Sequence, residues 1–147
     1  MMIIAHAPLA SSLKAVAEHA FPECALLLEA LDVPSDMPIE EVEALAQAML
    51  SRVRSPEAVI FTDVFGATPC NIAQRLADGV LVRVIAGVNV PMLWRSLCYA
   101  REPVESVVLR AMAGATQGVL QVERIAKLQN EIIESGDHDE EEPRYQQ

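Results

Sequence analysis

Short apolar runs alternate along the chain with segments in which apolar residues recur at helical spacing. Four runs, at residues 1–5, 24–31, 58–62 and 80–86, are almost wholly apolar, as expected of strands buried on both faces of a sheet. The second run is ambiguous between strand and helix, but its short length favours a strand. A fifth short run, at 118–122, predicts one further strand.

The segments between these runs predict helices. One helix is expected after Pro8 and another after Pro38, and Thr68 is expected to be the N-cap of a third. These three helices and two more are predicted at about 9–20, 39–53, 69–77, 91–100 and 103–116. The apolar faces of the first two are predicted to be Leu9, Leu13, Val16 and Ala20, and Ile39, Val42, Leu45, Met49 and Val53.

This alternation predicts an α/β fold: a doubly wound, mostly parallel four-stranded sheet with helices on both faces. The short strand at 118–122 would be added to it. One domain, residues 1–130, accounts for the pattern, and apolar content falls in a tail at 131–147. Hydrophobic residues make up 52% of the chain but aromatic residues only 4%, so an aliphatic core is expected.

The net charge of −10 is concentrated at the C-terminal end. Seven of the 21 acidic residues but only one of the 11 basic residues lie in 131–147, which leaves residues 1–130 with a net charge of −4. The tail is therefore predicted to be disordered. The sequence has no basic patch with interleaved aromatic residues, which argues against nucleic acid as a partner.

The three cysteines, Cys24, Cys70 and Cys98, do not have the spacing of a zinc site or a redox pair. We interpret them as buried thiols in a reducing compartment. The N-terminus lacks the pattern of a signal peptide, and no apolar run reaches the roughly 18 residues that a transmembrane helix needs. These features predict a cytoplasmic protein.

Candidate chemistry lies where predicted strands end, because ligands of open α/β sheets bind beyond the carboxyl ends of the strands. The first strand ends at His6 and the third at Asp63. These strands are neighbours in the common doubly wound orders, so the two side chains are expected to meet. An imidazole can carry a phosphoryl group on one nitrogen while a carboxylate at the other fixes its tautomer. Such chemistry requires no metal and no cofactor.

The surroundings of this pair offer further candidates. Helices that begin near Pro8 and at Pro69 would present N–H groups to phosphoryl oxygens, with the Thr68 hydroxyl beside the second. Each candidate also has a structural interpretation. Thr68 could be only an N-cap, Gly66 could supply only a positive φ, and Asn71 could be an ordinary first-turn residue.

Three stretches of the sequence carry a resemblance. They are Ile3-Ile4-Ala5-His6-Ala7-Pro8-Leu9-Ala10, Thr62-Asp63-Val64-Phe65-Gly66-Ala67-Thr68-Pro69-Cys70-Asn71 and Ile85-Ala86-Gly87-Val88-Asn89-Val90-Pro91-Met92-Leu93. The chain resembles, over residues 1–125, the IIA component of the mannose family of the bacterial sugar phosphotransferase system (PTS). That family usually has Thr-His-Gly at the active residue and two glycines in the second stretch, where this chain has Ala5-His6-Ala7 and Gly66-Ala67.

The resemblance implies a phosphotransferase that acts as a carrier and needs no cofactor. His6 would accept a phosphoryl group from the phosphohistidine of HPr and pass it to a IIB domain, with Asp63 hydrogen-bonded to the histidine. The phosphate pocket would include Thr68, Ala7, Gly66 and Asn71. The resemblance further implies a homodimer that exchanges the strand at 118–122, and a loose association with the membrane components IIC and IID.

Two alternatives remain open at the level of sequence. In a stand-alone regulatory protein, the phosphorylation state of His6 would control binding to a partner instead of sugar uptake. A receiver-like binding module would carry no phosphohistidine. A receiver normally has an acidic cluster at the end of its first strand, however, and this chain has His6 there.

Overall fold

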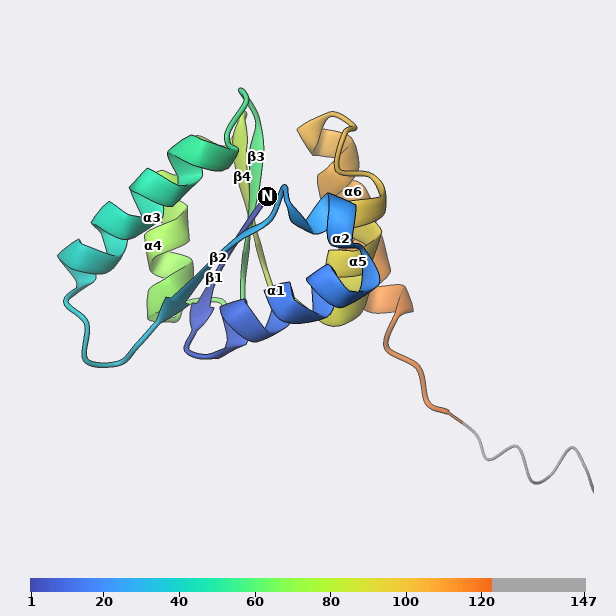
Figure 1. Cartoon of the computed structure of the whole chain (residues 1–147), viewed down its shortest axis with the longest axis horizontal. Helices are drawn as coiled ribbons and strands as arrows, with labels where there is room; N and C mark the ends of the chain where they lie inside the picture. The colour runs from blue at the N-terminus through green and yellow to red at the C-terminus, as the bar shows by residue number, and fades with distance from the viewer. Residues whose placement is uncertain (123–147) are drawn as a thin grey trace, which may run out of the picture.

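The computed structural model describes residues 1–122 (Figure 1). Four parallel strands form one sheet in the order β2-β1-β3-β4: β1 (Met2–His6), β2 (Glu29–Val33), β3 (Ala58–Thr62) and β4 (Val82–Ala86). The predicted doubly wound α/β fold is therefore confirmed, with every strand pair parallel. The predicted domain boundary at 130 and the tail at 131–147 lie outside the described residues.

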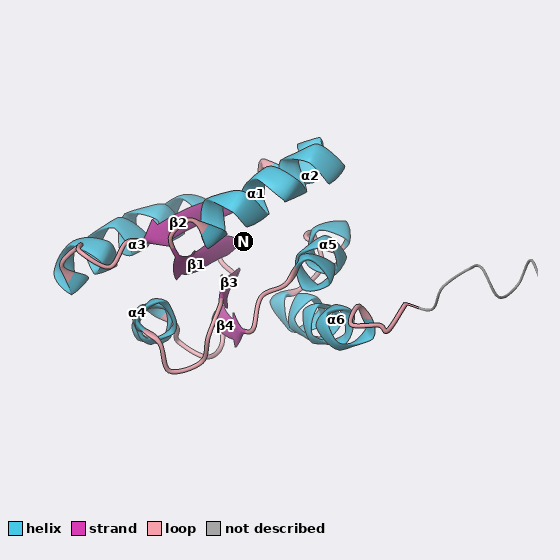
Figure 2. Cartoon of the chain, turned by 90° about the horizontal axis from the view of Figure 1, so that it is seen from below, coloured by secondary structure: helices cyan, strands magenta, loops and turns pink. Residues whose placement is uncertain are grey.

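Helices cover both faces of the sheet (Figure 1, Figure 2). One face carries α3 (Ile39–Val53) and α4 (Thr68–Leu76), and the other carries α1 (Leu9–Ala20), α2 (Pro22–Ala25), α5 (Val90–Cys98) and α6 (Val104–Gln117). Side chains alternate along each strand. Ile3 and Phe61 therefore belong to the core cluster under α1, α5 and α6, whereas Ile4 and Ile60 belong to the cluster under α3 and α4.

The predicted apolar face of α1 is wrong by about one position. The helix buries Ala10, Leu13 and Ala17, whereas Leu9 and Val16 are 38% and 41% exposed. Small side chains let α1 approach the sheet closely. Close packing therefore buries the face of α1 that is complementary to the sheet, and this is not the face with the largest apolar residues.

A similar correction applies to α3. It buries Val42, Ala46 and Leu50 and exposes Ile39 and Leu45, while the remaining members of the predicted stripe are half-buried against the core. Of the two predicted stripes, only Leu13 in α1 and Val42 in α3 are buried against the sheet.

Two predicted strands begin later than expected. The run at 24–31 is a strand only from Glu29, because Pro22 begins the short helix α2 and the chain turns before β2. β4 begins at Val82 because one carboxylate oxygen of Asp78 accepts hydrogen bonds from the N–H groups of residues 80, 81 and 82, which holds the chain in a turn. Residues 118–122 have no regular secondary structure in the single chain, so their exchange in a dimer stays a prediction.

The strand order creates a switch point between β1 and β3. α1, which follows β1, packs on one face, and α4, which follows β3, packs on the other. A crevice therefore opens beyond the carboxyl ends of these two strands, where ligands of such sheets bind. His6 is the last residue of β1, and Asp63 directly follows β3.

Candidate functional site

His6 and Asp63 meet in this crevice, as predicted. Nδ1 of His6 lies 2.6 Å from Oδ2 of Asp63, and the backbone N–H of His6 donates to the same oxygen at 3.0 Å. The other carboxylate oxygen accepts the N–H of Val64 at 2.8 Å. The Asp63 side chain is 9% exposed and that of His6 is 53% exposed, so the carboxylate is enclosed while the imidazole reaches the surface.

The carboxylate of Asp63 determines the state of the imidazole. Burial by itself would raise the pKa of Asp63, but hydrogen bonds from the backbone and ring of His6 and from the Val64 N–H outweigh it and hold this pKa below its ordinary 3.8. An ionised carboxylate only accepts hydrogen bonds, so Nδ1 carries the imidazole proton. Nε2 keeps its lone pair, and residues 1–122 provide no hydrogen-bond partner for it. This nitrogen is a suitable nucleophile.

The loop after Asp63 is shaped by Gly66 and Asn71. Gly66 has φ +84°, a conformation that side chains rarely adopt, and the Asn71 side-chain amide donates to its carbonyl at 3.2 Å. Gly66 therefore supplies the positive φ that the loop needs, and Asn71 holds the loop through its side chain. Their predicted contact with a phosphoryl group stays a prediction.

Thr68 lies beside His6, but it is not the N-cap that the sequence predicts. α4 begins at Thr68 itself, Ala67 occupies the cap position, and no side chain caps this helix. The Thr68 hydroxyl has no hydrogen-bond partner among the described residues. It therefore stays available, together with the N-terminus of α4, to an anion next to His6.

A cavity of about 320 Å³ lies between His6 and Thr68 on one side and the start of α3 on the other. Its other lining residues are mostly apolar: Val33, Pro34, Ser35, Met37, Ile39 and Val42. The imidazole thus borders a mostly apolar hollow.

The N-terminus of α1 contributes less than the sequence suggests. The N–H of Ala7 donates to the Val33 carbonyl at 3.1 Å, and the N–H of Ser11 donates to the Asp32 carboxylate at 3.1 Å. Ala7 can therefore take part in a phosphate site only through its position beside His6. The Asp32 carboxylate occupies the end of α1 that was expected to face phosphoryl oxygens.

The alanines that replace the family's usual residues fit the backbone. Ala5 is fully buried in β1. Among residues 1–122, every residue with positive φ is a glycine, so neither Ala7 nor Ala67 occupies a conformation that requires glycine. These substitutions leave the geometry of the His6–Asp63 pair intact.

Two supporting features were missed by the sequence reasoning. The N–H groups of Gly87 and Val88 donate to the carbonyls of Asp63 and Thr62 at 2.8 and 2.9 Å, so the loop after β4 supports the loop after β3. The side chain of Thr62 is fully buried, and its hydroxyl has no partner among the described residues. The sequence signals were that both loops follow predicted strand ends and lie within stretches that carry the family resemblance.

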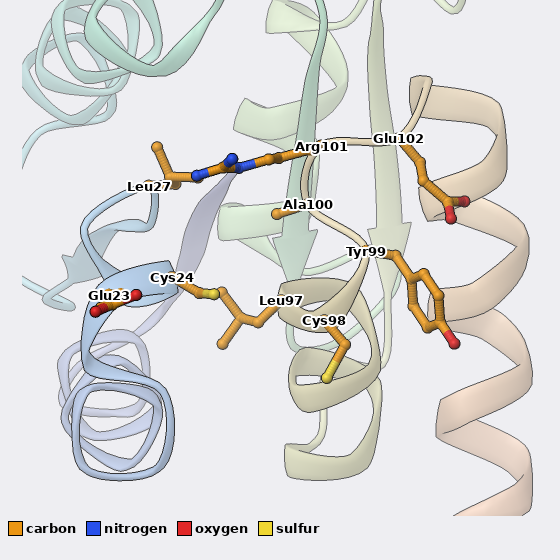
Figure 3. Close-up of a pocket in the computed structure, with 9 residues that line it drawn as sticks. All are labelled: Glu23, Cys24, Leu27, Leu97, Cys98, Tyr99, Ala100, Arg101 and Glu102. Atoms are coloured by element: carbon orange, nitrogen blue, oxygen red, sulfur yellow. The ribbon is translucent and has the colours of Figure 1, made fainter.

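A second cavity, of about 200 Å³, lies at the other end of the sheet, where α2 meets the end of α5 (Figure 3). Cys24 and Cys98 line it. Cys98 is exposed and Cys24 is half-buried, so the prediction of three buried thiols is confirmed only for Cys70. Within residues 1–122, no three histidine, cysteine or acidic side chains cluster in a way that could hold a metal ion.

The fold and the site together define a class of protein: a parallel α/β domain with a carboxylate-oriented histidine at its switch point. Comparison with protein families gives the family of the chain. The family EIIA-man, described as the PTS system fructose IIA component, matches residues 1–113. The chain therefore belongs to this family of PTS IIA components, and the resemblance noted in its sequence is confirmed.

Solved structures of PTS proteins share the fold. The mannose/sorbose-specific IIA subunit of Enterococcus faecalis has a TM-score of 0.74 at 19% identity, with 84% of this chain and 93% of that chain covered. The component EIIA of Streptococcus agalactiae has a TM-score of 0.72 at 19% identity, with coverages of 82% and 94%. A IIA protein associated with the fucose utilization operon of Streptococcus pneumoniae has a TM-score of 0.66 at 20% identity, with coverages of 88% and 93%.

A search of curated proteins gave no significant match. None of the helices within residues 1–122 has the length and apolar character needed to cross a bilayer.

Proposed function

We propose that this protein is a phosphocarrier of the phosphoenolpyruvate-dependent sugar PTS, which accepts a phosphoryl group on His6 from phospho-HPr and passes it to a IIB domain. The observation that carries the proposal is the 2.6 Å contact between Nδ1 of His6 and Asp63, in a pair whose imidazole is half-exposed. This contact leaves Nε2 as the free nucleophile. Membership in the PTS IIA family supports the proposal.

In the proposed transfer, the Nε2 lone pair of His6 attacks the phosphorus of the donor phosphohistidine. A P–N bond forms at Nε2 while the P–N bond to the donor breaks, and the donor imidazole leaves with the bonding electron pair. The proton on Nδ1 stays in place, and the positive charge that develops on the ring is stabilised by Asp63. Reversal of these steps delivers the group to a histidine or other nucleophile of the acceptor.

The phosphoryl oxygens would be stabilised from the side of α4. Transfer of this kind depends mainly on positioning and charge stabilisation. The N-terminus of α4 carries partial positive charge, and the Thr68 hydroxyl is without another partner among the described residues. Gly66 would line the pocket, and Asn71 and Ala7, whose N–H groups donate to the carbonyls of Gly66 and Val33, would shape it.

The test is incubation with enzyme I, HPr and phosphoenolpyruvate, followed by mass spectrometry under mildly alkaline conditions that preserve phosphohistidine. We expect one phosphoryl group on His6 in the wild type and none in a folded His6→Ala variant. His19→Ala is the matched control, because His19 is exposed on α1, and it should label normally. Labelling of His6→Ala, or an unlabelled wild type, would refute the assignment.

A second step separates transport from regulation. Labelled protein is mixed with IIB domains, and loss of the label with its appearance on IIB supports the transport relay. Protein that is labelled but discharges to no IIB domain would instead support a regulatory role, in which phosphorylated His6 controls binding to a partner.

We also propose that the protein is a homodimer in which residues 118–122 add a strand to the partner's sheet. Within residues 1–122, β4 pairs only with β3, so its other edge is free. Val119, Leu120 and Val122 are 73%, 76% and 89% exposed in the single chain, although all three are apolar. Leu120→Asp should therefore convert a dimer to a monomer in analytical ultracentrifugation, whereas Gln117→Ala should not. A monomeric wild type would refute the exchange.

A further inference from the structure

We propose that Asn89 is a positioning residue for phosphoryl transfer, which holds the loop that supports Asp63 and ties this loop to the end of α6. The role in transfer rests on the proposed function of His6. Asn89 touches neither the imidazole of His6 nor the carboxylate of Asp63. It would therefore act only through the residues that lie between Asn89 and this pair.

The first link runs from the loop before α5 to Asp63. The last paired residues of β3 and β4 are Thr62 and Ala86, and the N–H groups of Gly87 and Val88 continue the hydrogen bonding beyond this pair. Gly87 adopts φ +88°, so the loop depends on a specific backbone conformation. A change in this loop would move the Asp63 backbone and hence the carboxylate that contacts Nδ1.

The second link runs from the same loop to α5 and α6 through the side chain of Asn89. Its carbonyl oxygen accepts the N–H of Met92 at 2.9 Å and caps α5, and its amide nitrogen donates to the carbonyl of Ala115 at 3.4 Å. Ala115 lies in the last turn of α6, where carbonyls lack partners within the helix. One side chain therefore satisfies a free donor at the start of α5 and a free acceptor at the end of α6.

The two helices are pressed together where this link lies. A Cβ atom added at Gly118 would lie 2.2 Å from Cβ of Pro91, and one added at Gly114 would lie 2.7 Å from Cβ of Arg95. The end of α6 is thus held tightly against the first turns of α5. A shift of α6 would reach the Asp63 loop through Asn89 and the start of α5.

Asparagine suits this position because it combines an acceptor and a donor. Among the good N-cap residues, aspartate can accept from Met92 but cannot donate to Ala115. Asn89→Asp therefore keeps the cap and removes the link to α6, whereas Asn89→Ala removes both.

Two readouts on the full chain test the proposal. The first is the rate at which His6 is phosphorylated by enzyme I, HPr and phosphoenolpyruvate. The second is the tautomer of His6, measured from the ¹⁵N chemical shifts of its ring. The ring signals are assigned by comparison with His6→Ala, and this measurement requires no donor protein. Ser96→Ala is the matched control, because the Ser96 hydroxyl is buried in α5 and donates to the Met92 carbonyl without touching the loop.

We expect Asn89→Ala and Asn89→Asp to slow phosphorylation by about tenfold to a hundredfold, since small displacements remote from the chemistry can cost this much. The His6 ring should lose part of its Nδ1–H tautomer in both variants, and Ser96→Ala should retain the rate and tautomer of the wild type. Wild-type behaviour of Asn89→Asp would overturn the proposal. An equal loss in Ser96→Ala at matched melting temperature would also overturn it, because the effect would then reflect the stability of α5.

The tautomer readout separates this inference from the proposed function. A wild type that is not phosphorylated, but whose His6 tautomer still depends on Asn89, would refute the carrier function and support the positioning of Asp63. If the wild type is phosphorylated but the Asn89 variants keep its rate and its His6 tautomer, the carrier function would be supported and the positioning role of Asn89 refuted.

Discussion

Replacing Asp63 with asparagine removes the charge that orients His6 while keeping the shape of the side chain. In the wild type, the carboxylate accepts the Nδ1 proton, the His6 backbone N–H and the Val64 N–H. Asparagine can keep one oxygen as acceptor, but its NH₂ group can only donate. If that group faces the ring, Nδ1 must become the acceptor and the proton moves to Nε2, the nitrogen that should attack phosphorus.

The expected magnitude follows from the hydrogen bond that is lost. A hydrogen bond to a charged group contributes about 1.5–3 kcal/mol. At about 1.4 kcal/mol for each factor of ten in rate, Asp63→Asn should slow phosphorylation of His6 about tenfold to a hundredfold. The half-exposed imidazole favours the lower part of this range, because water screens the interaction.

The assay is a time course of phosphorylation by enzyme I, HPr and phosphoenolpyruvate, with the carrier at a concentration that makes its own step limiting. Asp32→Asn is the control, because Asp32 is a carboxylate on the neighbouring strand that accepts from Ser11 and does not contact the imidazole. We expect it to retain a rate near that of the wild type. Equal rates for Asp63→Asn and wild type would show that Asp63 only shapes the turn, and the orientation argument would be refuted.

Two further predictions concern stability. Thr62→Val should raise the free energy of unfolding by about 1–2 kcal/mol, because it removes a buried hydroxyl without a partner in the described structure. The measurement is urea denaturation, and a lower free energy of unfolding for Thr62→Val than for wild type would contradict this. Because the pKa of Asp63 lies below its ordinary 3.8 in the folded state, its carboxylate stabilises the fold above that pH, and this contribution is lost as the pH falls below it. Between pH 6 and pH 2, the free energy of unfolding should therefore fall more steeply for wild type than for Asp63→Asn. Parallel plots of this free energy against pH would contradict the prediction.

Local sequence patterns located most of the elements. The apolar runs of β1 and β3 were recognisable because strands buried on both faces tolerate few polar residues. The positions of His6 and Asp63 at strand ends followed from these runs and from the general rule for open sheets, so the central pair could be predicted without coordinates.

The faces of the helices were harder to predict. α1 and α3 contain alanine on several sides, and periodicity alone counted the larger residues Leu9 and Leu45 as core. The sheet instead accommodates Ala10 and Ala46, because the distance between helix and sheet is set by packing across the whole layer. That distance is not encoded in any single helix.

The sequence by itself determined the fold class, the family and the histidine–carboxylate pair, since these depend on apolar runs and motifs that are contiguous along the chain. Only the tertiary structure decided how the pair is supported. It placed Gly87 and Val88 on the backbone of the β3 loop and Asn89 between α5 and α6, and it put Asp32, which does not contact the pair, at the start of α1. These contacts join residues that are far apart in sequence, and they depend on the geometry of strand ends and helix termini that comes into existence only when the sheet and both helix layers are assembled.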